Sequence, residues 1–110
     1  LLAAKGIMAT VWDVRSCAPL DPAMIADAMQ HDFVITAEDG IRDGGIGSSI
    51  ADEVGLESAK QAQSPRVYTF GIPTEFIAQA KPDAILKQLQ LDAQGMANSV
   101  KSIVTNCAAQ

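Results

Sequence analysis

Three short apolar segments constrain the fold of this chain more than any other feature. Residues 7–14, 33–37 and 66–72 are rich in β-branched and aromatic side chains, and Pro73 ends the last of them. Residues 7–14 are apolar almost throughout, which is typical of a strand buried on both faces of a parallel sheet. Helical patterns separate the three segments. We therefore expect an α/β domain with three layers, α/β/α, around a mostly parallel sheet.

Capping residues mark where the helices begin. Asp21 and the proline after it open a helix that we expect to end near His31. Ser48–Ser49 cap a second helix, and residues 56–65 are polar enough to form its fraying end or a loop. Asp92 caps the last helix. The apolar side chains of this helix recur at helical spacing and form one stripe: Met96, Val100, Ile103, Val104 and Cys107.

The first residues have the composition of a helix end. Leu1–Lys5 contains strong helix formers, and Gly6 stands where a left-handed cap is favoured. A chain that starts in the last turn of a helix indicates a piece of a longer protein. Three strands are also few for such a sheet, which typically has ~5 to 6. We expect residues 1–110 to form a single domain that is truncated at its N-terminus.

The overall charge excludes two classes of partner. The 110 residues carry 13 acidic and 8 basic side chains, a net charge of −5, with no basic stripe that would bind nucleic acid or an anionic membrane. No apolar run approaches the roughly 20 residues that span a bilayer. The first residues also lack a secretory signal. These features predict a soluble, cytoplasmic protein.

The two cysteines predict neither a metal site nor a redox site. Cys17 and Cys107 stand ninety positions apart without a neighbouring ligand, and this spacing fits no zinc or thiol–disulfide motif. We expect two reduced thiols, with a disulfide as the less favoured alternative. No other group of residues in the sequence has metal-ligand spacing.

A glycine-rich turn is the one local motif with a chemical mechanism. Gly44, Gly45, Gly47 and Ser48 follow the second apolar segment and precede a helix, an arrangement that binds phosphate through backbone N–H groups and the helix dipole. The known nucleotide-binding fingerprints are incomplete here, since Ile46 stands where a phosphate-binding loop needs lysine. The favoured alternative is that these glycines permit a tight turn and close helix packing.

Three further side chains are candidates for acid–base chemistry. Glu38 and Asp39 end the second apolar segment, where ligands of α/β proteins usually bind. They act either as acid and base or, as we favour, as hydrogen-bond acceptors that hold the glycine turn. For His31, the only histidine, a helix-end or packing role is favoured over that of a catalytic base. We therefore assign no catalytic, cofactor-binding or metal-ligating residue.

Four stretches of the chain together carry a family resemblance: residues 9–15 with 19–21, residues 31 and 34–40, residues 44–48, and residues 71–77 with 89–96. The amino-acid sequences of these stretches and their order along the chain resemble the C-terminal domain of the 1-deoxy-D-xylulose-5-phosphate synthase family. The first three are shared with transketolase and with the β subunits of 2-oxo-acid dehydrogenases. The last stretch, with its Gly-Ile-Pro and Leu-Asp-Ala-x-Gly series, is similar to the synthase in particular.

The resemblance implies a transferase that condenses pyruvate with glyceraldehyde 3-phosphate, with loss of carbon dioxide, and feeds isoprenoid, thiamine and pyridoxal synthesis. It implies thiamine diphosphate and Mg²⁺ as cofactors and a homodimer. In that family the reacting groups come from other domains, so we expect this chain to be inactive alone, to bind no cofactor, and to supply packing and subunit contacts. The alternatives are a regulatory anion-binding module that uses Gly44–Ser48, or the equivalent domain of a transketolase or 2-oxo-acid dehydrogenase.

The family's domain begins with a strand and a full helix before the position of Leu1. The resemblance therefore implies that residues 1–110 lack the first strand and most of the first helix of a transketolase C-terminal-like domain. That strand lies between two of the strands expected here, so its loss leaves unpaired backbone edges in the sheet. Our hypothesis is that dimerisation, strand exchange or rearranged pairing fills this gap.

Overall fold

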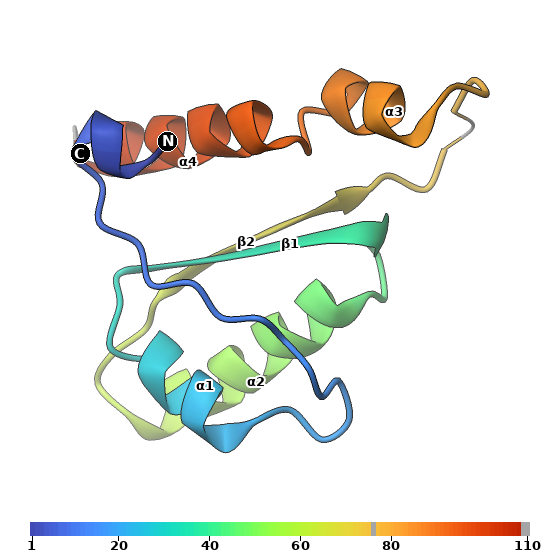
Figure 1. The fold of residues 1–110 in the computed structure, drawn as a ribbon. Coiled ribbons are helices and arrows are strands. Elements are labelled where there is room, and N and C mark those ends of the chain that lie inside the picture. The colour runs from blue at the N-terminus through green and yellow to red at the C-terminus, as the bar shows by residue number, and fades with distance from the viewer. Residues whose placement is uncertain (76, 109–110) are drawn as a thin grey trace. The chain divides into compact units, whose positions relative to one another are not determined.

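A computed structural model describes residues 1–75 and 77–108 of the chain (Figure 1). Phe76, which belongs to the resemblance at residues 71–77, lies outside the described residues. The chain divides into two compact units: Trp12–Thr74 forms one, and Leu1–Val11 with Glu75–Gln110 forms the other. The elements are, in order, η1 (Ala3–Lys5), α1 (Pro22–Ala28), β1 (Phe33–Ile41), α2 (Ile46–Lys60), β2 (Arg66–Ile72), α3 (Pro82–Gln88) and α4 (Ala93–Ala108).

Strands β1 and β2 run parallel and form the sheet of the unit Trp12–Thr74. Their register pairs Phe33 with Arg66 and continues to Ala37 with Phe70. An irregularity then separates this run from the last pair, Ile41 with Ile72. Parallel strands need a crossover connection, and α2 provides it. The helix returns the chain to the end of the sheet where β1 began, so that β2 starts beside it. The α/β class and the parallel pairing predicted from the sequence are confirmed.

The core of this unit lies between the sheet and its two helices. Figure 1 shows α1 and α2 on the same side of the strand pair, and α2 contacts both strands and α1. Val34 of β1 and Val67 of β2 pack against the buried cluster. Since side chains alternate along a strand, Thr36 and Thr69 point to the same side as these valines. The buried cluster consists of Met24, Ile25, Met29, Ile50 and Val54.

The prediction of a strand at residues 7–14 is wrong. This segment forms no regular element, and the side chains of Met8 and Val11 are 89% and 88% exposed. A β-branched sequence favours a pleated surface only where a neighbouring strand supplies backbone hydrogen bonds and cover. Within the described residues β1 and β2 pair only with each other, so residues 7–14 have no such neighbour. A side-chain hydrogen bond joins this segment to α1: Trp12 Nε1 donates to Asp27 Oδ2 at 2.7 Å.

Helix α2 is longer than its sequence pattern indicates. It begins at Ile46 with Gly45 as its N-cap, not at Ser48–Ser49, and it continues to Lys60. Its buried side chains Ile50 and Val54 hold the first half against the core, and Ser58 Oγ donates to the Val54 carbonyl at 2.7 Å. The polar residues after Gly55 therefore propagate a helix that tertiary packing has already nucleated.

Two helix caps in the other unit form as the sequence predicts. Gly6 has φ +77° and donates its N–H to the Ala3 carbonyl at 3.0 Å, so the left-handed cap after η1 is confirmed. Asp92 Oδ1 accepts from the Gly95 N–H at 3.0 Å and caps α4. None of the helices in the described ranges is long and apolar enough to cross a bilayer.

Candidate functional site

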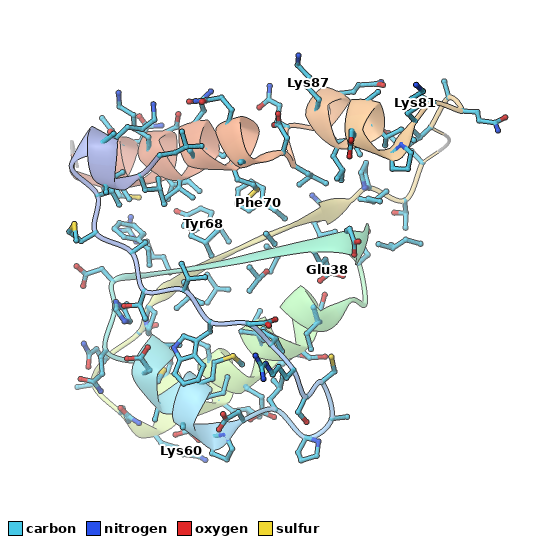
Figure 2. All side chains as sticks on the ribbon, in the orientation of Figure 1. Glu38, Lys60, Tyr68, Phe70, Lys81 and Lys87 are labelled. Carbon is cyan, nitrogen blue, oxygen red and sulfur yellow. The ribbon has the colours of Figure 1, made fainter. Side chains whose placement is uncertain are left out.

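The glycine-rich turn between β1 and α2 brings Glu38 together with the predicted glycines and Ser48. Glu38 lies near the end of β1, and Figure 2 places it beside the start of α2. Gly44 has φ +78°, a conformation that glycine adopts without strain. The turn leads directly into Gly45, whose extended backbone forms the N-cap of α2. The strand–turn–helix arrangement expected from the sequence is therefore present.

The carboxylate of Glu38 occupies the inside of this turn. Its Oε2 accepts from the backbone N–H of Gly47, in the first turn of α2, at 2.8 Å. A Cβ at Gly45 would overlap Oε1 of the same carboxylate. A negative group at a helix N-terminus is stabilised by the exposed N–H groups and the helix dipole. The favoured interpretation of Glu38, a hydrogen-bond acceptor that holds the glycine turn, is confirmed; its neighbour Asp39 is exposed.

The remaining polar groups of the turn bind one another. Ser48 Oγ accepts from Gly44 N and donates to the Arg42 carbonyl, both at 3.2 Å. Arg42 N donates to the Ile72 carbonyl at 2.9 Å, which joins the turn to β2. The N–H groups of Gly44 and Gly47 are thus already used by Ser48 and Glu38. An anion would compete with the protein's own carboxylate, and the anion-binding role of Gly44, Gly45, Gly47 and Ser48 stays a prediction.

Two contacts at this site are not predicted by the sequence. Thr74 Oγ1, after β2, donates to Asp43 Oδ2 in the turn at 3.0 Å, and these residues are 31 positions apart. Thr36 lies beneath the start of α2: a Cβ at Gly47 would stand 2.5 Å from Thr36 Oγ1 and 3.3 Å from the Cβ of Thr69. Gly47 therefore permits close helix packing, as the alternative interpretation of the glycines predicts. No local pattern points to pairs so distant in sequence.

The Thr36 hydroxyl is the one anomaly of the site. Thr36 is 8% exposed, and among the described residues its Oγ1 has no hydrogen-bond partner. A buried hydroxyl without a partner destabilises a fold. It faces the Gly47 backbone and leaves no room for a side chain there. This arrangement indicates that close contact between β1 and α2 outweighs the unmet hydrogen bond.

The other candidate side chains form none of the hydrogen bonds of the turn described above. His31 follows α1, donates its backbone N–H to the Ala28 carbonyl at 3.1 Å, and has its Nε2 3.7 Å from Asp27 Oδ1. This confirms the helix-end interpretation. Cys17 is exposed, and neither it nor Cys107 takes part in a disulfide. No group of three or more His, Cys, Asp or Glu side chains that could hold a metal occurs in the described residues.

We expect Glu38→Ala to lower the free energy of unfolding by about 1.5–3 kcal/mol, because it removes a charge-assisted hydrogen bond to a helix N-terminus. Asp39→Ala is the matched control, since the neighbouring carboxylate is exposed, and a change within about 0.5 kcal/mol is expected. Urea denaturation followed by circular dichroism measures both. Equal losses in the two variants would contradict the capping role of Glu38.

The turn does not fit the diphosphate of thiamine diphosphate, the cofactor that the family resemblance implies. The helix N-terminus that would receive a phosphate holds the Glu38 carboxylate, which would repel it. In residues 1–75 and 77–108, no three His, Cys, Asp or Glu side chains form a group that could hold a metal ion beside the turn. No catalytic step is assigned to these residues.

The same segments place the chain among known proteins. Residues 1–96 match the family described as transketolase, C-terminal domain. The chain is 43% identical over 109 residues, 99% of its length, to the 1-deoxy-D-xylulose-5-phosphate synthase of Thermobifida fusca, of which it covers 16%. It is 37% identical over 108 residues, 96% of its length, to the synthase of Shewanella oneidensis, of which it covers 17%.

A further relative is 1-deoxy-D-xylulose-5-phosphate synthase 2 of Kitasatospora griseola, with 40% identity over 105 residues; the match covers 96% of this chain and 16% of the relative. The chain thus spans about a sixth of the length of the curated relatives it matches. The family match includes β1, the glycine turn, α2 and β2. This chain belongs to the transketolase C-terminal domain family.

Proposed function

We propose that this chain is the C-terminal domain of a 1-deoxy-D-xylulose-5-phosphate synthase. The observation that carries the proposal is the 43% identity to such a synthase over 99% of the chain. The segment that distinguishes the synthase from its relatives also has a structural role here. In Leu91-Asp92-Ala93-Gln94-Gly95, the aspartate caps α4, and a Cβ at Gly95 would stand 2.6 Å from the Gln90 carbonyl oxygen.

The complete enzyme would condense pyruvate with glyceraldehyde 3-phosphate, with loss of carbon dioxide, as a homodimer that uses thiamine diphosphate and Mg²⁺. Thiamine diphosphate would supply the carbanion chemistry from a site built by other domains. This chain would contribute packing and subunit contacts. Two observations support a role without catalysis: Glu38 and Ser48 are engaged in holding the turn, and His31 lies at the end of α1.

A chimeric enzyme tests this proposal. The segment of the Thermobifida fusca synthase that aligns with this chain is replaced by these 110 residues, and product formation from pyruvate and glyceraldehyde 3-phosphate is measured. We expect activity that depends on thiamine diphosphate and Mg²⁺, because the replaced segment supplies packing rather than reacting groups. A second chimera carrying the equivalent transketolase segment is the control. Activity in the control alone, with both chimeras folded, would overturn the assignment to the synthase.

The isolated chain tests the non-catalytic role separately. Calorimetric titration with thiamine diphosphate and Mg²⁺ is expected to give no saturable binding at millimolar cofactor, since Glu38 occupies the helix N-terminus. Saturable micromolar binding would place a cofactor site within these residues. That result would contradict the packing role while leaving the family assignment intact.

A further inference from the structure

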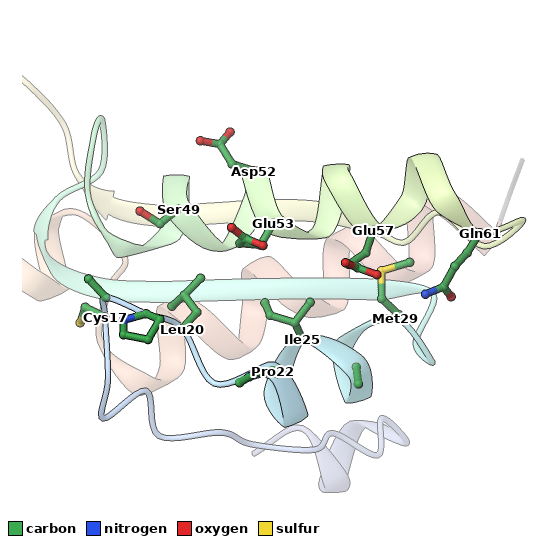
Figure 3. A pocket seen from close by; sticks show the side chains of 13 residues that line it. Cys17, Leu20, Pro22, Ile25, Met29, Ser49, Asp52, Glu53, Glu57 and Gln61 are labelled. Carbon is green, nitrogen blue, oxygen red and sulfur yellow. The ribbon is translucent and has the colours of Figure 1, made fainter.

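A groove runs between α2 and the segment formed by α1 and the loop before it, within the unit Trp12–Thr74. Its volume is about 660 Å³ (Figure 3). One wall is polar and comes from α2. The other is mostly apolar and includes Leu20, Pro22, Ile25 and Met29. The groove lies on the helical side of the sheet, and none of Glu38, Gly44, Gly45 or Gly47 lines it.

The polar wall extends along one side of α2. Its residues Ser49, Glu53, Glu57 and Gln61 recur every four positions and so lie in one line on the helix surface. From Ser49 to Gln61 the chain advances twelve residues, which corresponds to about 18 Å along a helix axis. Figure 3 shows Glu53 and Glu57 on the side of α2 that faces Ile25 and Met29. A surface of this length fits two or three turns of a peptide helix better than a compact small molecule.

The apolar wall gives the groove a hydrophobic floor. Ile25 and Met29 are 6% and 1% exposed, so only their outermost atoms line the groove. Pro22 and Ala26 are exposed and form the rim on that side. An occupant with aliphatic side chains would cover these atoms, as amphipathic helices do when they bind in a groove. Because the floor is already largely buried, this contact contributes modestly to affinity.

The charge of the groove determines the kind of occupant. Asp52, Glu53 and Glu57 line it, and no Lys or Arg does. Within the described residues Glu53 has no ion pair, whereas Glu57 Oε1 is 3.0 Å from Lys60 Nζ. Residues 12–74 as a whole contain ten Asp and Glu against four Lys and Arg. The field over the groove is therefore negative and complementary to a cationic partner.

We propose that this groove docks a cationic amphipathic helix of a partner protein. Its Lys or Arg side chains would recur every three or four residues opposite Glu53 and Glu57. Its adjoining aliphatic side chains would lie against Leu20 and Ile25. The proposal goes beyond the role in the synthase, because the groove is separate from the glycine turn and concerns an interaction surface.

Titration with a defined peptide tests the docking surface. The probe is a fluorescent, end-blocked helix of about 16 residues, about one turn longer than the polar wall, with Lys every fourth residue, Leu beside each Lys and Ala elsewhere. Anisotropy with the full chain is expected to show saturable binding that weakens as salt rises. A shuffled peptide of the same composition, with no cationic face, is expected to bind more weakly. Equal binding of both peptides would overturn the proposal.

Two substitutions on α2 are expected to act in opposite directions. Glu53→Gln should raise the Kd about two- to five-fold, the effect of one exposed ion pair. Lys60→Gln should lower the Kd about two-fold, because it frees Glu57 from its own ammonium partner. Asp83→Asn and Lys87→Gln on α3 make the same changes in net charge at residues that do not line the groove, and they are expected to leave the Kd unchanged.

The controls separate the groove from general attraction to an acidic protein. If Asp83→Asn weakens binding as much as Glu53→Gln does, the peptide responds to net charge and the proposal fails. Sedimentation of the chain alone tests the other occupant, a second copy. Self-association that Glu53→Gln abolishes would assign the groove to a dimer and likewise overturn the proposal. Circular dichroism confirms that each surface variant is folded before it is titrated.

Discussion

We expect Met29→Ala to lower the free energy of unfolding by about 2–5 kcal/mol, the range for deleting a buried methionine side chain. Met29 is 1% exposed and belongs to the cluster that joins α1, α2 and the sheet. Alanine would leave a cavity that the surrounding side chains fill only in part. Since domains of this size are typically stable by about 5–15 kcal/mol, the loss is a large fraction of the total.

Met8→Ala is the matched control for this substitution. Met8 is 89% exposed, so the same change should alter the free energy of unfolding by no more than about 0.5 kcal/mol. Urea denaturation followed by circular dichroism compares the two variants with the unchanged chain. A loss at Met8 as large as that at Met29 would mean that the core is built differently, with residues 7–14 packed inside it.

The second large effect is expected at Gly47. Gly47→Ala should lower the free energy of unfolding by about 1–3 kcal/mol, the usual result of adding atoms to a filled space. The new Cβ would stand 2.5 Å from Thr36 Oγ1 and 3.3 Å from both the Thr69 Cβ and Glu38 Oε2. Either α2 moves away from β1 or the Glu38 hydrogen bond lengthens. Urea denaturation again gives the magnitude.

Gly55→Ala is the control and should have the opposite sign. Gly55 lies in the same helix with nothing within 4 Å of a Cβ, so alanine should stabilise the chain by about 0.5–1 kcal/mol. Thr36→Ala added to Gly47→Ala should recover part of the loss, because it removes the atom nearest the new Cβ. Destabilisation by both glycine substitutions, against the higher helix propensity of alanine, would show that the contact with Thr36 is not the cause of the loss at Gly47.

These two results bear on the role proposed for the chain. If its contribution to a synthase is packing, variants that loosen the core or the turn should reduce the activity of the chimeric enzyme through its folding. Substitution of the exposed Asp39 should then leave activity intact, although this carboxylate is a sequence-level candidate for acid–base chemistry.

Local signals in the sequence predicted the element boundaries that depend on neighbouring residues alone. Asp21 accepts from the Ala23 N–H at 2.8 Å, and Asp92 accepts from the Gly95 N–H, as capping residues should. Gly6 adopts the left-handed conformation predicted for it. In each case the interacting groups lie within four positions along the chain. A sequence pattern therefore contains all the partners that the interaction needs.

Longer-range features were predicted less well. Residues 7–14 have the composition of a strand, but a strand also requires a neighbour with unpaired N–H and carbonyl groups, and composition does not encode that neighbour. Helix α2 continued beyond its apolar face because Ile50 and Val54 anchor its first half to the core. Both differences arise because tertiary contacts override local propensity.

The sequence by itself determined the α/β class, the family, and the glycine turn that joins β1 to α2. Apolar segments, caps and glycines depend on residues that are close together along the chain, so they can be predicted without a structure. Only the tertiary structure decided that Glu38 occupies the start of α2, that Gly47 lies against Thr36, and that residues of α1 and α2 line a common groove. These features depend on distances across the fold, which packing sets and which no single segment contains.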